Sequence, residues 1–171
     1  MGYAVADAEE RYRVASTART KVNVVKAVLD RHPGEPALVI GAYLEQLDEL
    51  GEALGCPVVQ GSTRNRDREA LFDAFRRGEV PRLVVSKVAN FSIDLPEASV
   101  AIQVSGSLGS RQEEAQRLGR LLRPKESGRT ASFYTLIARD TVDQDFAQNR
   151  QRFLAEQGYS YTILDADGIA A

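Results

Sequence analysis

The chain has 171 residues, 43% of them hydrophobic and 27% charged, and its formal net charge is −2. This length allows one domain with a sizeable core, and the charge balance excludes a strongly basic surface, so any nucleic-acid contact must be a local patch. One cysteine, one histidine and no apolar run near 18 residues exclude a disulfide framework, a structural zinc site and a membrane span. No signal peptide is recognisable, so we expect a cytoplasmic protein without a membrane partner.

The predicted elements alternate between helix and strand. Residues 1–15 have few apolar anchors and are expected to form a loosely ordered lead-in or linker. A helix is predicted over 16–32, and a strand over 37–41, whose continuous apolar run is typical of a strand covered on both faces. A second helix, predicted to end at Gly55, carries an apolar stripe of Leu44, Leu47, Leu50 and Leu54.

The alternation continues along the rest of the chain. A short strand over 57–60 precedes a helix with Thr63 as its plausible N-cap, which is predicted to end at Gly78. The later elements are strands over 82–86, 100–104 and 131–138, a helix from Ser110 to Pro124, a helix over 141–158 and a strand or extended tail over 159–164. This order predicts an α/β domain over 16–165, with a mostly parallel sheet and helices on both faces, followed by a tail over 166–171.

The helix that begins at Ser110 carries a row of polar side chains opposite its apolar stripe. Gln112, Gln116, Arg120 and Arg123 share this face, and Gly119 lets another group approach the backbone closely. Guanidinium groups bind phosphate oxygens through a planar fork, so two of them with an amide suit a triphosphate. The alternative for an isolated helix is a solvated arginine and glutamate face.

Residues 116–123, Q-R-L-G-R-L-L-R, resemble the sixth motif, Q-R-x-G-R-x-x-R, of superfamily-two helicases. The resemblance implies that Arg120 and Arg123 reach the γ-phosphate of ATP as arginine fingers, with Gln116 as a γ-phosphate sensor and Gly119 beside the nucleotide. Residues 86–96, S-K-V-A-N-F-S-I-D-L-P, are similar to the fifth motif, T-D-x-A-x-R-G-I-D-I-P. There Phe91 and Ser92 replace the usual Arg-Gly, and Ser92 and Asp94 are the expected nucleotide contacts.

The segments that follow the predicted strands are candidate contacts for a DNA backbone, because ligands bind at the carboxyl ends of parallel strands. Gly41 and Tyr43 resemble the fourth motif, although Tyr43 could equally be a packing residue. Ser62, Thr63 and Arg64 precede a helix whose amides favour an anion, or they form a well-capped surface turn. The hydroxyl and ammonium at the end of the third strand, from Ser86 and Lys87, are able to donate to a phosphodiester.

The three motifs in order make the chain similar to the XPB branch of DNA-repair helicases, in its bacterial form. This resemblance implies a RecA-like three-layer helicase C-terminal domain over residues 16–165. The chain has no G-x-x-x-x-G-K-[ST] loop and no Asp-Glu pair after an apolar strand. The resemblance implies that ATP and Mg²⁺ are held mainly by a first RecA-like domain of the same full-length protein, and this chain alone is expected to be inactive as an ATPase.

Two other functions fit the same α/β pattern. One is a nucleotide-sugar or phosphate-ester enzyme, in which Asp94 would hold a ribose. The other is a non-catalytic interaction module that docks on another motor. Cys56 lies between two predicted elements and is expected to fill the core rather than act as a nucleophile.

Overall fold

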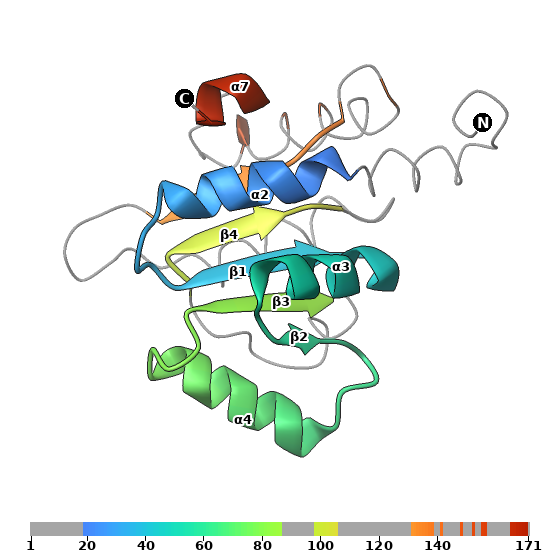
Figure 1. Ribbon diagram of the computed structural model, residues 1–171, viewed down its shortest axis with the longest axis vertical. Coiled ribbons are helices and arrows are strands. Elements are labelled where there is room, and N and C mark those ends of the chain that lie inside the picture. The colour runs from blue at the N-terminus through green and yellow to red at the C-terminus, as the bar shows by residue number, and fades with distance from the viewer. Residues whose placement is uncertain are drawn as a thin grey trace, which may run out of the picture.

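The computed structural model describes residues 19–86, 98–105, 131–138 and 165–170, with residues 141, 148, 152, 155 and 156. The elements in chain order are α2 (Thr20–Asp30), β1 (Ala37–Gly41), α3 (Leu44–Leu54), β2 (Val58–Val59), α4 (Asn65–Arg76), β3 (Arg82–Ser86), β4 (Val100–Gln103), β5 (Ser132–Thr135) and α7 (Ala166–Ala170) (Figure 1).

The five strands form one sheet in the order β2-β3-β1-β4-β5, and every pairing is parallel. All five residues of β1 are buried, as its uninterrupted apolar sequence predicts for a central strand. The prediction of an α/β fold around a parallel sheet is therefore confirmed.

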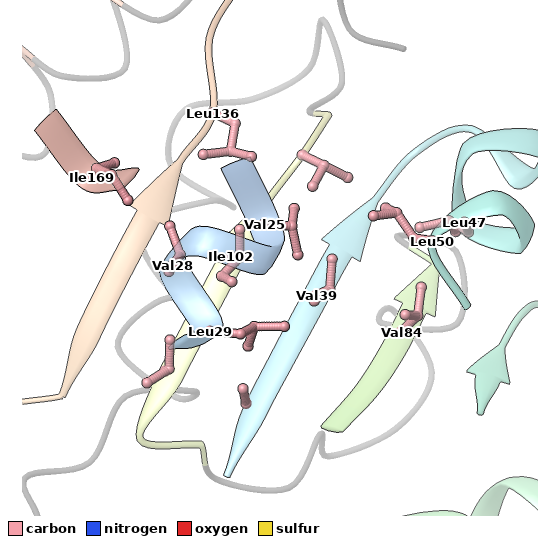
Figure 2. Close-up of a cluster of buried hydrophobic side chains, with 13 residues drawn as sticks. Val25, Val28, Leu29, Val39, Leu47, Leu50, Val84, Ile102, Leu136 and Ile169 are labelled. Atoms are coloured by element: carbon pink, nitrogen blue, oxygen red, sulfur yellow. The ribbon is translucent and has the colours of Figure 1, made fainter. Parts of the chain in front are cut away.

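Helices cover both faces of this sheet. Successive side chains of a strand point to opposite sides, so the apolar side chains of the strands form a separate cluster with the helices on each face. On one face Val39 packs in a cluster with Val25 of α2 and Leu50 of α3 (Figure 2). On the other face a second cluster unites Leu38 and Ile40 of β1 with Phe72 and Phe75 of α4. Burial of each such side chain contributes about 1.5–3 kcal/mol, so these two clusters dominate the stability of the described core.

The ends of α3 and α4 follow the predicted glycine signals. Gly55 adopts a left-handed φ of 62° directly after α3, and Gly78 has a φ of 77° two residues after α4 ends. Glycine takes this conformation without the penalty that a Cβ brings. The helix predicted over 16–32 ends two residues earlier than expected, at Asp30, and residues 16–18 lie outside the described part.

The segment expected to be a tail contains α7. Ile169 is only 8% exposed and belongs to the cluster that includes Val28 of α2, and Arg31 donates a hydrogen bond to the carbonyl oxygen of Gly168 at 2.7 Å. A five-residue helix with one apolar anchor has no periodic pattern to detect. Residues 148, 152, 155 and 156 are helical, whereas the helix predicted from Ser110 and the strand over 159–164 lie outside the described residues.

Candidate nucleic-acid interface

All five strands end at the same edge of the sheet, because every pairing is parallel. The register places Gly41 beside Ser86, and Val59 of β2 beside Val85 of β3. Neighbouring strands lie about 4.8 Å apart. The carboxyl ends of β2, β3, β1 and β4 therefore lie next to one another, at the edge where open α/β sheets bind ligands.

The segment from Gly41 to Tyr43 joins β1 to α3. A Cβ on Gly41 would lie 2.8 Å from Leu47 Cδ2 and 3.0 Å from Ser105 Oγ, so the close approach requires glycine. Tyr43 is half-buried at the N-cap of α3, and its carbonyl accepts a hydrogen bond from the Leu47 N–H at 3.1 Å. Gly41 thus has a packing role, and the DNA contacts of both residues stay predictions.

The segment between β2 and α4 is a turn closed by its own hydrogen bonds and held by a buried arginine. The Thr63 hydroxyl accepts from the Gln60 N–H at 2.9 Å, and the Thr63 N–H donates to the Gln60 carbonyl at 3.0 Å. Arg68, only 5% exposed, donates from Nη2 to the carbonyl of Thr63 at 3.1 Å and, at 3.5 Å, to those of Gln60 and Gly61. These contacts fix the carbonyl groups of the turn toward the protein.

The prediction of Thr63 as the N-cap of α4 is wrong. Its hydroxyl is used inside the turn, so Arg64 occupies the N-cap and no side chain caps the helix. Ser62, Arg64 and Arg66 are exposed, whereas Thr63 is half-buried. Uncapped N–H groups, the positive end of the helix dipole and exposed guanidinium groups together favour an anion such as a phosphate.

Ser86 ends β3 and is 1% exposed, so its side chain is the least accessible of the described candidates. Contact with a phosphodiester stays a prediction for this residue. The remaining candidates lie outside the described residues; they are Lys87, Ser92, Asp94, Gln116, Gly119, Arg120 and Arg123.

A buried polar cluster beneath this edge was not predicted. The Ser105 hydroxyl accepts from the Ala42 N–H at 2.8 Å and donates to Gln46 Oε1 at 2.9 Å. Lys21 donates from Nζ to the Val104 carbonyl at 2.8 Å. The pattern held a signal, because Lys21 is in phase with the buried Val25 and Val28, and Gln46 with Leu50, so both polar side chains fall on apolar stripes.

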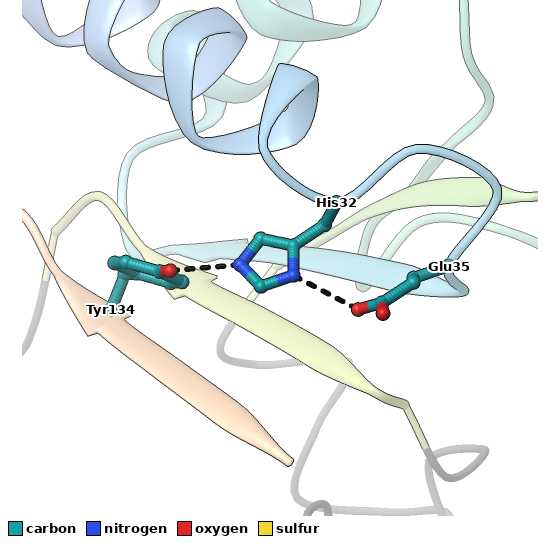
Figure 3. Close-up of polar contacts among 3 residues, drawn as sticks. All are labelled: His32, Glu35 and Tyr134. Atoms are coloured by element: carbon teal, nitrogen blue, oxygen red, sulfur yellow. Dashed lines mark hydrogen bonds and ion pairs between the residues drawn. The ribbon is translucent and has the colours of Figure 1, made fainter. Parts of the chain in front are cut away.

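His32 belongs to a separate cluster near the start of β1. Its Nδ1 lies 2.9 Å from Glu35 Oε2 and its Nε2 lies 2.8 Å from the Tyr134 hydroxyl (Figure 3). Burial raises the pKa of Tyr134, with Arg31 lowering it and Glu35 raising it further. The three side chains satisfy one another and link α2 to β5, so this histidine has a structural role.

The remaining chemistry-bearing groups of the described part form no second site. Burial raises the pKa of the Cys56 thiol, which Arg82 partly counteracts, and the side chain packs against the core. A raised pKa disfavours the thiolate, which supports the expected packing role over a nucleophilic one. Among the residues described, no three metal-ligating side chains come together and no helix is both long and apolar enough to cross a bilayer.

Comparison with known proteins identifies the family of this chain. Residues 2–169 match the ERCC3/RAD25/XPB C-terminal helicase family. The chain belongs to this family. The "DNA 3'-5' helicase XPB" of Mycobacterium tuberculosis is 69% identical over 169 residues, which cover 99% of this chain and 31% of the relative. The XPB subunit of transcription and DNA repair factor IIH from Drosophila melanogaster is 40% identical over 136 residues, covering 77% of this chain and 17% of the relative.

Solved structures agree on the fold. The C-terminal domain of the DEAD-box protein Dbp5 has a TM-score of 0.71 at 16% identity, covering 83% of this chain and 82% of that chain. The Pyrococcus furiosus Hef helicase domain has a TM-score of 0.56 at 20% identity, covering 76% of this chain and 27% of that chain. The fold is thus that of a RecA-like helicase C-terminal domain, as predicted. The chain spans about a third or less of the length of the curated relatives above.

Proposed function

We propose that this chain is the second motor lobe of an ATP-dependent DNA helicase or translocase of the XPB type, acting in DNA repair. The observation that carries the proposal is the family match over residues 2–169. It favours a motor over a nucleotide-sugar or phosphate-ester enzyme. The sequence contains no phosphate-binding loop, and the chain covers only 31% of its relative from Mycobacterium tuberculosis. The remaining part of such a protein would supply a first lobe, which makes most of the contacts that hold ATP and Mg²⁺.

The carboxyl edge of the sheet forms half of a DNA track in this proposal. Exposed Ser62 and Arg64, at the uncapped start of α4, bind one phosphate group, and half-buried Tyr43 contacts the backbone nearby. Gly41 and Thr63 shape the segments that make these contacts, and Ser86 with Lys87 continues the track after β3. Contacts to phosphate and sugar carry no base information, so binding is sequence-tolerant and weakens with salt.

The nucleotide side of the proposal rests on motif order and on chemistry. Arg120 and Arg123 stabilise charge on the γ-phosphate, Gln116 senses that group, and Gly119 allows close approach. Ser92 and Asp94 complete the contacts by donating to and accepting from the nucleotide. An arginine finger contributes roughly 10³ to 10⁵ in turnover, but only where a phosphate cradle already holds ATP. Bound ATP and Mg²⁺ supply the reactive phosphoryl group and its charge neutralisation.

The test compares ATP turnover by the chain alone with turnover by the chain joined to the first helicase lobe of the Mycobacterium tuberculosis relative. We expect no turnover above buffer from the chain alone, and turnover stimulated by single-stranded DNA from the joined protein. Neither lobe alone should respond to DNA in this way. Steady turnover by the purified chain that Arg120→Ala abolishes would contradict the proposal.

A matched control separates the loss of a specific guanidinium from a general change of surface charge. Arg77 is exposed and pairs only at the surface with Glu79, at 2.9 Å. Exposed pairs of this kind contribute little to stability. Arg77→Ala in the joined protein should therefore keep the native DNA-stimulated turnover.

A further inference from the structure

Gln60 follows the edge strand β2 and contacts helices that lie on opposite faces of the sheet. β2 is the outermost strand in the order β2-β3-β1-β4-β5 (Figure 1). The Gln60 side chain donates from Nε2 to Asp48 Oδ1 of α3 at 2.6 Å. Its backbone carbonyl accepts from the Thr63 N–H at 3.0 Å and from Arg68 Nη2 of α4 at 3.5 Å. One residue thus joins α3 to the turn that leads into α4.

The close packing of α3 on β2 brings the Asp48 carboxylate to the end of this strand. A Cβ on Gly51 would overlap Val58 Cγ2, so α3 approaches β2 this closely because residue 51 is glycine. Asp48 lies one helical turn before Gly51, in the i, i+3 relation that places two residues on neighbouring positions of a helix surface. Gln60 lies two residues after Val58. The bond between Gln60 and Asp48 involves a carboxylate, and such bonds are shorter and stronger than those between neutral groups.

Both helices that this bond links begin at a residue proposed to contact DNA. Tyr43 is the N-cap of α3 and Arg64 is the N-cap of α4. Asp48 lies in the second turn of α3, close in sequence to Tyr43, and Gln60 opens the turn that ends at Arg64. The bond between Asp48 and Gln60 therefore fixes the start of α4 relative to the start of α3.

We propose that Asp48 and Gln60 are positioning residues, which hold Tyr43 and Arg64 at the spacing at which both contact one DNA strand. The inference rests on the proposed function. Groups that are held in place before binding lose less conformational freedom when the strand binds. Neither Asp48 nor Gln60 needs to touch DNA for this effect.

The expected effect of removing Asp48 is opposite in sign to the effect of its charge. An exposed carboxylate near a phosphate backbone repels it, so loss of the charge alone should strengthen DNA binding. Loss of the bond to Gln60 should weaken DNA binding, because the turn of residues 60–64 is then less well fixed. The sign of the change therefore distinguishes positioning from electrostatics.

The test is binding of a labelled single-stranded oligonucleotide to the 171-residue chain, measured by fluorescence anisotropy at one low salt concentration. We expect Asp48→Ala to weaken binding about threefold, and Gln60→Leu, which removes the side-chain donor, to cause a similar loss. Asp48→Asn keeps the acceptor oxygen without the charge, so its affinity should be native or higher. Glu49→Ala is the matched control, because it removes an exposed carboxylate from the next position of α3, and its affinity should also be native or higher.

A double variant shows whether Asp48 acts through the turn. In Arg64→Ala, the further change Asp48→Ala should cause no additional loss of affinity, because the contact that Asp48 positions is already gone. If Asp48→Ala binds DNA at least as tightly as the native chain while Arg64→Ala binds more weakly, the inference is overturned and the proposed DNA track stands. Fully additive losses in the double variant would also overturn the inference. If Arg64→Ala keeps native affinity, the proposed DNA track fails at this turn and the inference falls with it.

Discussion

Arg68 Nη2 lies 3.1 Å from the carbonyl oxygen of Thr63, and this buried contact ties α4 to the turn that precedes it. The turn contains Ser62 and leads to Arg64, both exposed and both proposed to contact DNA. The buried Arg68 thus fixes the turn that positions Ser62 and Arg64. The stability of the fold and the affinity for DNA should therefore both depend on Arg68.

We expect Arg68→Lys to lower the free energy of unfolding by about 1–3 kcal/mol and to weaken DNA binding about tenfold. Lysine keeps the charge but lacks the planar fork that contacts several carbonyls. Denaturant unfolding and fluorescence anisotropy with a labelled oligonucleotide measure the two effects. Arg76→Ala is the control, because Arg76 is 48% exposed and its bond to Asp73 lies at the surface. An Arg68→Lys protein with native DNA affinity would show that the turn does not depend on the guanidinium group of Arg68.

Arg64→Ala should reduce the salt dependence of DNA binding. One phosphate contact by a cation contributes about 1 to the slope of log K against log salt, so the slope should fall by about that amount. The measurement is a titration at several salt concentrations, with Arg77→Ala as an exposed arginine away from the proposed track. An unchanged slope in Arg64→Ala would remove this residue from the DNA contacts.

Gly51→Ala should destabilise the fold although alanine is the better helix former. A Cβ at Gly51 would overlap Val58 Cγ2 and lie 3.3 Å from the Cys56 carbonyl oxygen, so α3 would be forced away from β2. Overpacking of this kind costs about 1–3 kcal/mol, which over most of that range is larger than the gain in helix propensity of about 1 kcal/mol. Gly168→Ala in α7 is the control, because a Cβ there meets nothing within 4 Å. The midpoint of denaturant unfolding should therefore fall in Gly51→Ala and should not fall in Gly168→Ala. A Gly51→Ala protein as stable as the native chain would contradict the packing of α3 against β2.

The raised pKa of Cys56 predicts a pH dependence above neutrality. Burial makes the folded state hold the thiol proton more tightly than the unfolded state, despite the opposing effect of Arg82. This group's contribution to stability is therefore fully present below its ordinary pKa of 9.0 and is lost as pH rises through the higher folded pKa. Iodoacetamide should react with Cys56 more slowly in the folded chain than in urea, and Cys56→Ala should lack this component of the pH dependence. Equal alkylation rates in both states would contradict the burial.

Periodicity and glycine signals predicted much of the described fold. The apolar run at Ala37–Gly41 and the strand at Arg82–Ser86 have their predicted bounds, and α3 ends before Gly55 as expected. Thr63 was assigned to the wrong role because the same hydroxyl suits a helix cap or a turn, and only the fold brings the Gln60 N–H to it. The short helix α7 was missed since Ile169 finds its partners far away in sequence, on α2.

The candidate site also has a part that the sequence predicted and a part that it did not. The predicted strands placed the proposed DNA contacts at strand ends, and the structure shows that Gly41 pairs with Ser86, an adjacency that the sequence did not predict. The buried partners beneath them escaped prediction, because Ser105 and Gln46 are 59 residues apart and neither forms a motif. Long-range side-chain contacts of this kind follow from packing, which a local pattern does not encode.

The most direct test of the second-lobe assignment is DNA-stimulated ATP turnover by the joined two-lobe protein when Arg120 or Arg123 is replaced by alanine. The account predicts that either replacement lowers turnover by roughly 10³-fold or more, while DNA binding and Arg77→Ala turnover stay near native. Turnover that remains within a few-fold of native in both Arg120→Ala and Arg123→Ala would contradict the claim that this lobe supplies the arginine fingers.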